Sequence, residues 1–422
     1  MNKPHRPVWQ SASNRVIIVL LIVAIIMCSI TTVSFFRDPK RAASSIFYIG
    51  FADQYMDFFH CVHEASDLGI YQSVSSSLYP PLINLVYYGL SKLISPSLLQ
   101  QGATAMRGSA EGMRLFWGFQ GTISILFLLA LAWMTRGKWW KKALVVVLGL
   151  ISMPLMYAME RGNNVALSVF FVTIYLICLH DPSPKKRESG FLCLAIAANI
   201  KLYPALFGLL LILEKRKKEA LRCIVYGLVL FFVPLLIYGG FVPFKRIIIN
   251  VLYNSRVQVE NSISYKISWI NFFNIVCTAL HIPLFRGLSF ILLMCSTAAL
   301  FFLREYWQKV LLITLMCIGF TDFSFVYNTL YLFPVLLIMM NVKKPDRLFS
   351  FASIVISISL FPLAIGGPNP FPSLSGDTLL ALNVTTLIDC ICVMVLTVSM
   401  MISAFLGIKS GKEARNSVGM RV

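Results

Sequence analysis

Long apolar runs separated by short polar segments dominate this chain. The first run covers residues 16–36, and others follow at 79–94, 115–135, 143–159 and 165–180. Because a helix rises about 1.5 Å per residue, a run of about 20 apolar residues can cross the hydrocarbon core of a bilayer. The runs are continuous and do not alternate with polar residues, which excludes a transmembrane barrel. The pattern predicts an all-α polytopic membrane protein.

Two further apolar stretches predict broken helices. Residues 190–213 have basic clusters at both ends, so they cannot form one crossing, and each limb around Lys201 and Pro204 would be about 17 Å long. Residues 310–340 form the other stretch, which the partly polar segment 321–328 interrupts. We expect re-entrant pairs whose apices lie inside the protein, where backbone groups left unpaired by proline can be satisfied. With them, the chain would have about 11 to 13 membrane segments.

Composition supports the membrane class. The chain has 422 residues, of which 58% are hydrophobic and 13% charged, whereas about 25% of the residues in a soluble domain are charged. The net charge of +19 falls in clusters between apolar runs, so orientation in the bilayer explains it better than nucleic-acid binding. The ten cysteines lie mostly in apolar segments without metal-ligand spacing, which predicts neither disulfides nor a metal site.

The basic clusters also predict a topology. Residues 1–36 resemble an uncleaved signal anchor, with the N-terminus in the cytoplasm and the first membrane helix after it. A long outer loop would then cover 37–78, a membrane bundle 79–408 and a cytoplasmic tail 409–422, all within one domain, 1–422. Two more outer loops are predicted, at 244–266 and 367–377.

Charged side chains in or beside membrane segments are costly, which makes them candidates for function. They are Asp53, Asp57, Glu64, Asp67, Glu160, Arg161, Lys201 and Asp322. On a helix, Asp53 and Asp57 would share one face near the exit of the first segment. A carboxylate there could act as a general base toward a hydroxyl group. The alternative is that both are solvated loop residues.

The other candidates also leave alternatives open. Residues 160–164 interrupt two apolar runs. Either Glu160 and Arg161 pair at a helix end, or Gly162 forms a turn in which backbone and amide groups approach a sugar or phosphate. Lys201 either reaches the surface or meets an anion inside the membrane, for which a lipid-linked phosphate is the natural choice.

Two histidines beside Glu64 raise the alternative of a metal site. His60 and His63 precede Glu64, and these residue types could act as metal ligands. The spacing is loose and no third ligand is evident, so the sequence gives little support for a metal.

Four motifs in order resemble glycosyltransferase family 87, whose members are GT-C-type membrane mannosyltransferases that use polyprenyl-phosphate sugars. The motifs are Asp57-Phe58 with Ala65, Gly69 and Tyr71; Tyr79-Pro80-Pro81; Arg161-Gly162-Asn163-Asn164; and Ile200-Lys201-Leu202-Tyr203-Pro204. They cover about the first 225 residues of the chain. A fainter match runs from Tyr327-Asn328 to Pro334.

The resemblance implies an outward-facing active site, with inverting transfer and Asp57 as the base. Two positions depart from the family pattern: Gly162-Asn163 replaces the usual Gly-Gln, and Cys61 stands where the family often has tyrosine. Phosphate is a good leaving group, so neither a metal nor another cofactor is expected. The residues expected to bind the donor phosphate or the substrates are Tyr79, Arg161, Asn163, Asn164, Lys201, Tyr203, Arg256, Tyr327 and Asn328.

We therefore expect an integral membrane glycosyltransferase. It would move a hexose, mannose by the resemblance, from polyprenyl phosphate to a lipid-linked or envelope glycan on the periplasmic or extracellular side of a bacterial inner or plasma membrane. The main alternative is a flippase or exporter of lipid-linked sugars, for which inverted repeats and a site at the midplane are typical. A second alternative, an envelope polymerase or ligase, would place its large outer loop late in the chain.

Overall fold

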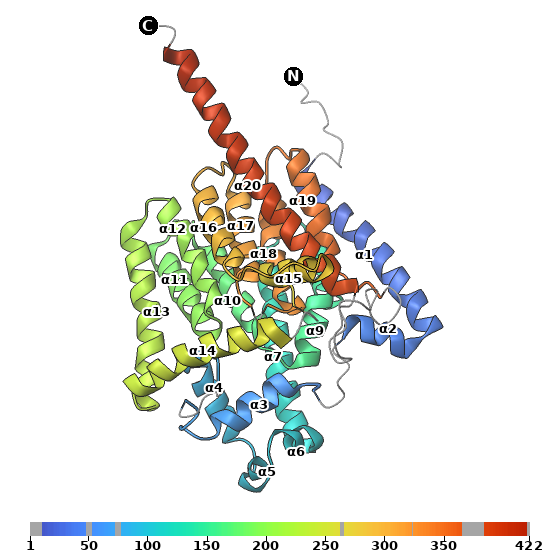
Figure 1. Ribbon diagram of the computed structural model, residues 1–422, viewed down its shortest axis with the longest axis vertical. Coiled ribbons are helices and arrows are strands. Elements are labelled where there is room, and N and C mark those ends of the chain that lie inside the picture. Colours follow the sequence, from blue (N-terminus) through green and yellow to red (C-terminus); the bar gives the residue numbers. More distant parts are fainter. Residues whose placement is uncertain are drawn as a thin grey trace. The chain divides into compact units, whose positions relative to one another are not determined.

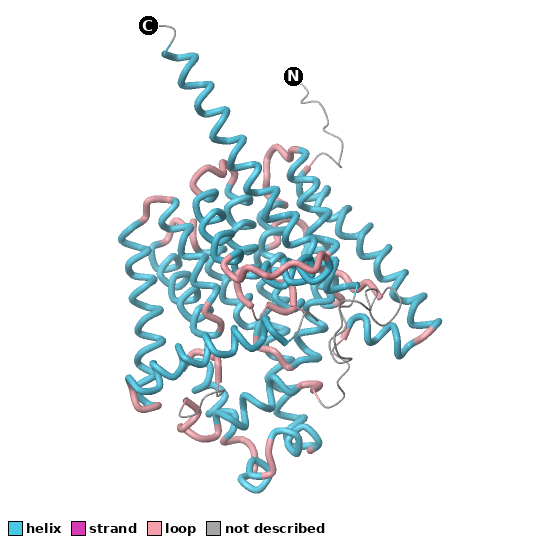
Figure 2. The backbone as a smooth tube through the Cα atoms, viewed as in Figure 1, coloured by secondary structure: helices cyan, strands magenta, loops and turns pink. Residues whose placement is uncertain are grey.

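The computed structural model consists of helices joined by loops (Figure 2). It describes residues 11–47, 53–71, 77–261, 266–322, 324–364 and 384–419. Within these ranges the β-structure is an isolated bridge between Lys266 and Phe325, so the predicted all-α class is confirmed. The chain divides into two compact units, Asp38–Ser262 and the combination of Met1–Arg37 with Ile263–Val422. The single domain stays a prediction.

The unit Asp38–Ser262 contains most of the predicted first outer loop and the helices that follow it. Its elements are α2 (Pro39–Ile46), α3 (Met56–Ala65), α4 (Pro81–Ser91), α5 (Pro96–Gln100), α6 (Ala103–Gly108), α7 (Ala110–Met134), α8 (Trp139–Leu150), α9 (Met153–Arg161), α10 (Val165–Cys178), α11 (Pro184–Ile200), η2 (Tyr203–Gly208), α12 (Leu209–Leu213), α13 (Lys217–Ile237) and α14 (Phe241–Asn261). Helix α10 packs against α7 and α11, and α11 packs against α13 (Figure 1). Helix α3 rests on α4 and α6.

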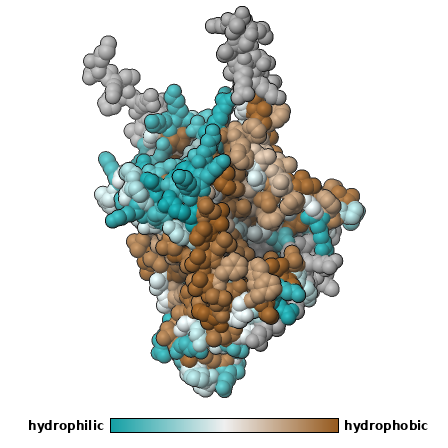
Figure 3. Space-filling model, turned by 90° about the vertical axis from the view of Figure 1, so that its left-hand side faces the viewer, coloured by the Kyte–Doolittle hydropathy of each residue, from teal (hydrophilic) through white to brown (hydrophobic). Residues whose placement is uncertain are grey.

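The burial of these helices follows their side chains. Helix α10 is apolar on nearly every side and is largely buried, as expected for a helix at the centre of a bundle. Helix α13 instead leaves a row of large apolar side chains exposed, from Leu221 to Ile237. Figure 3 looks onto the side that carries α13, and apolar side chains predominate over much of this face. Such a surface is stable in contact with lipid.

The other unit combines the first helix with the C-terminal part of the chain. Its elements are α1 (Ala12–Arg37), α15 (Trp269–Ala279), α16 (Leu288–Leu300), α17 (Tyr306–Gly319), η3 (Val326–Tyr331), α18 (Leu332–Met339), α19 (Arg347–Ile358) and α20 (Val384–Gly419). Helix α1 packs against α19, and α20 packs against α15, α16, α17 and α19. The hydroxyl group of Thr31 donates to the carbonyl of Pro362 at 2.7 Å and accepts from the N–H of Ala364 at 3.0 Å. Hydrogen bonds thus join α1 to the segment after α19.

Several of the described helices can cross a membrane. Helices α1, α7 and α13 are long and apolar enough, as is α20 over Val384–Ile408. Helices α8 and α9 together would give a fifth span, bent by 48°. Shorter apolar helices of 10–17 residues make up much of the rest. The polytopic membrane class is confirmed, and the number of 11 to 13 segments stays a prediction.

Both predicted helix breaks are present. Helix α11 ends at Ile200 and η2 begins at Tyr203, with Pro204 in its first turn, where a missing N–H costs little. Helix α17 ends at Gly319, and η3 begins at Val326. The expected length of the first limb was wrong: α11 begins at Pro184 and contains the whole basic cluster, so its 17 residues extend about 25 Å rather than 17 Å. The re-entrant course through the membrane stays a prediction.

The second predicted outer loop is mostly helical, because α14 runs through it to Asn261. Phe244, Ile247 and Val251 recur at helical spacing and join the apolar core of their unit, a periodicity that the basic residues between them concealed. Lys266, which was expected in that loop, is only 3% exposed. The predicted tail begins as a continuation of α20. Residues 1–10 and the loop at 367–377 lie outside the described residues.

The glycine that ends α17 gives a test of packing in this unit. A Cβ added to Gly319 would overlap the indole ring of Trp269, which is buried and donates to the Thr397 hydroxyl at 3.2 Å. We expect Gly319→Ala to destabilise the protein by about 1–3 kcal/mol, measured as a lower midpoint of thermal unfolding in detergent. The control is Gly118→Ala in α7, where the added Cβ would meet no atom of another segment within 4 Å. An unchanged midpoint for Gly319→Ala would contradict this packing.

Candidate functional site

The predicted first outer loop brings two acidic side chains to the end of α9. Asp57 lies in the first turn of α3, and Asp53 lies in the turn before it. Tyr55, between them, has a left-handed backbone with φ of 63°, and its N–H donates to the carbonyl of Glu160 at 2.8 Å. The predicted helix does not extend back to Asp53. The turn at Tyr55, and not a common helix face, directs both carboxylates toward Arg161.

Arg161 bridges these two acids. Its Nη1 group pairs with the carboxylate of Asp53, and its Nη2 group lies 2.6 Å from Oδ1 of Asp57. A planar guanidinium group with five N–H donors is suited to binding two carboxylates at once. Within the described residues, no hydrogen-bond donor reaches the buried carboxyl oxygens of Glu160. The ion pairs of Arg161 therefore join it to α3 and to the turn before α3, and not to the adjacent Glu160.

Asn163 fixes the other side of the Asp57 carboxylate. Its Nδ2 group donates to Oδ2 of Asp57 at 2.8 Å, while its own Oδ1 accepts from the N–H of Val165 at 3.1 Å. The Nε2 group of Gln120 donates to the backbone carbonyls of Ala158 and Asn163 at 3.1 and 2.9 Å. Each oxygen of Asp57 thus has a donor, and the orientation of its carboxylate is set by two residues of one turn.

That turn requires glycine at position 162. Gly162 ends α9 with φ of 72°, a conformation that side chains rarely adopt. An added Cβ would lie 2.9 Å from both the Cβ of Phe58 and the carbonyl oxygen of Tyr55. The close approach of the α9–α10 turn to α3 therefore depends on the absence of a side chain here.

Lys201 joins the same site from the break after α11. Its Nζ group donates to the hydroxyl of Tyr79 at 3.3 Å and lies 4.6 Å from the centre of that ring, a cation–π geometry. Lys201 is also close enough to Asp57 and Cys61 to interact electrostatically with them. The structure thus brings Lys201 close to Asp57 and Tyr79, both of which precede it by more than 120 residues.

Buried polar residues hold the segment that carries Tyr79. The hydroxyl of Tyr71 donates to the carbonyl of Tyr79 at 2.7 Å. The Nδ2 group of Asn84 approaches that carbonyl to 3.3 Å and donates to Ser77 Oγ at 3.0 Å. Sequence reasoning missed Gln120 and Asn84. The sequence could have identified both residues, since each is a polar amide inside an apolar run.

Asn164 and Cys61 are buried beside the candidate site. The Nδ2 group of Asn164 donates to the hydroxyl of Tyr87 at 3.1 Å, and both residues are buried. Burial, with the nearby charges of Glu64 and Asp57, raises the pKa of the Cys61 thiol. A thiol with a raised pKa is a poor nucleophile. The described residues contain no group of three His, Cys, Asp or Glu side chains that could hold a metal ion.

The remaining predicted residues lie on other elements of the chain. Tyr203 begins η2, two residues after Lys201. Arg256 lies on α14, and its side chain is outside the described part of the chain. Tyr327 and Asn328 lie in η3 of the other unit, where Asn328 donates to Ser324 Oγ at 3.1 Å.

A family model for glycosyltransferase family 87 matches residues 78–320, more than half of the chain. The chain belongs to this family. Together with its apolar helices, this membership makes the protein a membrane glycosyltransferase. The matched segment includes Arg161, Asn163 and Lys201, whereas Asp57 precedes it. Searches of curated proteins and of solved structures gave no match.

The bridging role of Arg161 can be tested by stability. Arg161→Met leaves the partly buried Asp53 and Asp57 without their cation, and we expect a loss of about 2–3 kcal/mol. Adding Asp53→Asn should recover part of that loss. Arg222→Met is the control, because the Arg222 side chain is 50% exposed in its pairing with Glu188, and such a pair contributes at most about 1 kcal/mol. Equal shifts in thermal midpoint for the two single variants would refute the bridge.

Proposed function

We propose that this glycosyltransferase moves a hexose, mannose by its family resemblance, from polyprenyl phosphate to a hydroxyl group of a lipid-linked or envelope glycan. The observation that supports this best is the arrangement at Asp57. A partly exposed carboxylate is held by Arg161 and Asn163, with the cation of Lys201 within electrostatic range. These are a base and an anion-binding group in one site.

The reaction would be a single inverting displacement. The acceptor oxygen forms a bond to the anomeric carbon, the bond from that carbon to the phosphate oxygen breaks, and the phosphate leaves with the electron pair. The proton of the acceptor hydroxyl passes to the Asp57 carboxylate. No metal is needed in this sequence of bond changes, since the leaving group is a phosphate monoester.

Asp57 has the features of a general base for this step. Its side chain is 20% exposed, so an acceptor can reach it. Each carboxylate oxygen has two lone pairs, so the donors on Oδ1 and Oδ2 leave room for the incoming proton. Asp53 and Asp57 together carry one more negative charge than Arg161 neutralises. Arg161 is therefore better suited to positioning the base than to binding an anionic donor.

Lys201 is better placed to stabilise the leaving group. The donor is a phosphodiester with one negative charge, and transfer releases a monoester with up to two. A preorganised cation stabilises charge that develops in the transition state. The hydroxyl of Tyr79, 3.3 Å from Lys201 Nζ, provides a second polar group next to that phosphate.

The position of Lys201 along α11 supports an outer-face site. The basic residues at the start of α11 are expected in the cytoplasm. Lys201 follows the other end of this helix, about 25 Å away, which is most of the thickness of the hydrocarbon core. We propose that the site faces the periplasmic or extracellular side of a bacterial plasma membrane.

The base is tested by Asp57→Asn in reconstituted membranes with a radiolabelled polyprenyl-phosphate mannose donor. We expect kcat to fall by about 10²–10⁴-fold, the usual contribution of a general base. Asp53→Asn is a matched control, since it also removes one carboxylate partner of Arg161. Asp53→Asn should lower kcat much less than Asp57→Asn does. Near wild-type turnover for Asp57→Asn, or equal losses in both variants, would exclude Asp57 as the base.

The leaving-group role of Lys201 predicts a loss in kcat. Lys201→Met should lower kcat by about 10²–10³-fold, as for removal of one group that stabilises a transition-state charge. Lys201→Arg should retain part of the activity, because it keeps the positive charge. Lys185→Met, which removes an exposed lysine at the other end of α11, is the control. A Lys201→Met enzyme with unchanged kcat and only a raised KM would show that the lysine does not act in the transition state.

A further inference from the structure

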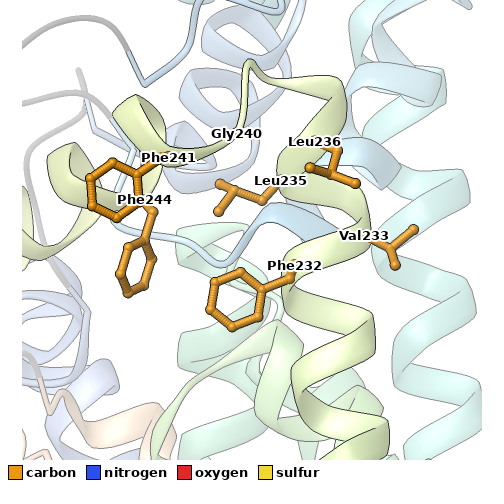
Figure 4. A pocket seen from close by; sticks show the side chains of 7 residues that line it. All are labelled: Phe232, Val233, Leu235, Leu236, Gly240, Phe241 and Phe244. Carbon is orange, nitrogen blue, oxygen red and sulfur yellow. The ribbon is translucent and has the colours of Figure 1, made fainter.

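Two features of the unit Asp38–Ser262 lie outside the proposed reaction. One is an apolar groove at the corner between α13 and α14 (Figure 4). Its lining side chains are all hydrocarbon, so the groove presents no polar group that could select a ligand. The other is the carboxyl group of Glu160, which lies within electrostatic range of Asp57 but outside the Arg161 bridge. Glu160 is the feature that bears on the chemistry of the site.

The backbone of Glu160 holds this residue beside the proposed base. Glu160 lies in the last turn of α9, and its carbonyl accepts from the N–H of Tyr55 at 2.8 Å. Both carboxyl oxygens of Glu160 are buried, and no donor among the described residues reaches them. The charged groups in electrostatic range are Arg161, Asp57 and Asp53. Helices α8 and α10 also pack against α9, and their described residues add no charge in this range.

Three features of this position disfavour a negative charge on Glu160. A buried carboxylate without a hydrogen-bond donor is costly, whereas a neutral carboxyl group costs far less. Asp53 and Asp57 already carry one more negative charge than Arg161 neutralises, and like charges nearby favour the protonated form of an acid. The C-terminal end of a helix also carries a partial negative charge. All three features favour a protonated Glu160.

Glu111, in the same unit, has the opposite surroundings. It lies in the first turn of α7, where the helix dipole favours a negative charge. The N–H and the hydroxyl of Ser95 donate to its two carboxyl oxygens at 2.6 and 3.0 Å. Hydrogen bonds of this kind stabilise the ionised form. The chain thus offers a matched pair of glutamates, one with a donor on each oxygen and one with none.

We propose that Glu160 is a positioning residue that acts as a neutral carboxylic acid, and that its neutrality keeps Arg161 on Asp57 and lets the anionic donor bind. This inference rests on the proposed function. An ionised Glu160 would be a third carboxylate competing for one guanidinium group, which would weaken the hold of Arg161 on Asp57. It would also repel the donor phosphate. The alternative is an ionised Glu160 that balances the charge of Arg161 directly.

Infrared spectroscopy of the reconstituted protein tests the protonation state. A protonated carboxylic acid has a C=O stretching band that a carboxylate lacks. When the Glu160→Gln spectrum at neutral pH is subtracted from that of the wild type, we expect this acid band to remain. Glu111→Gln is the matched control, and its difference spectrum should contain carboxylate bands instead. Carboxylate bands in the Glu160→Gln difference would overturn the proposal.

The pH dependence of KM tests the positioning role. As pH rises, Glu160 loses its proton, whereas a glutamine cannot ionise. We expect KM for polyprenyl-phosphate mannose to rise about tenfold more in the wild type than in Glu160→Gln, as for one unit charge acting on another across part of a protein. Loss of the proton from Lys201 affects both proteins alike. At neutral pH, Glu160→Gln should retain most of the activity that Glu160→Ala loses, because the amide has the shape of the neutral acid. Equal alkaline rises in KM, or no rescue by glutamine, would overturn the role.

The two measurements also separate this inference from the proposed function. If the acid band belongs to Glu160 but no polyprenyl-phosphate sugar is used, the donor assignment fails and the protonated Glu160 stands. If transfer from polyprenyl-phosphate mannose occurs and the acid band is absent, the inference about Glu160 alone fails.

Discussion

The bridge that Arg161 forms between Asp53 and Asp57 is the interaction on which the site depends. It joins segments more than 100 residues apart and sets the position of α3 against the end of α9. Unpaired carboxylates beside apolar helices would carry a high desolvation cost. The guanidinium offsets that cost and leaves both carboxylate groups partly exposed. The Arg161 bridge thus both stabilises this part of the fold and sets the geometry of Asp57. The absence of a side chain at Gly162 allows the close approach that the bridge requires.

A second constraint is the end of α11. If the helix continued beyond Ile200, its helical turn would set the direction of the Lys201 side chain. The backbone at Lys201 is extended instead. Its Nζ group then reaches the ring and hydroxyl of Tyr79. The hydroxyl of Tyr71 and the amide of Asn84 hold the backbone of Tyr79. The positive group is therefore positioned by a helix end and by a buried hydrogen-bond network, as a preorganised site requires.

Much of this arrangement could be predicted from the sequence, because charges are rare in apolar runs. That rarity identified Asp57, Arg161 and Lys201, and the basic clusters with Pro204 located the break after α11. The left-handed turn at Tyr55 and the partners of Arg161 could not be predicted, since they depend on contacts between distant segments. Helix α14 was missed for a different reason, namely that basic residues such as Lys245 and Arg246 interrupt its apolar positions. The amide of Asn163 forms hydrogen bonds to Asp57 and Val165, and its expected contact with substrate stays a prediction.

In the proposed reaction, the separation of the two cations lets one site serve two charged groups, the base and the donor phosphate. If a single cation bound both the base and the phosphate, release of the phosphate dianion would draw it away from the carboxylate while the proton is being transferred. Here two carboxylates hold Arg161, whereas Lys201 is held by an aromatic ring and a hydroxyl group. A cation–π contact binds a cation more weakly than a pair of carboxylates does. In the proposed reaction, Lys201 is therefore the cation expected to respond to charge developing on the donor, while Arg161 keeps Asp57 in place.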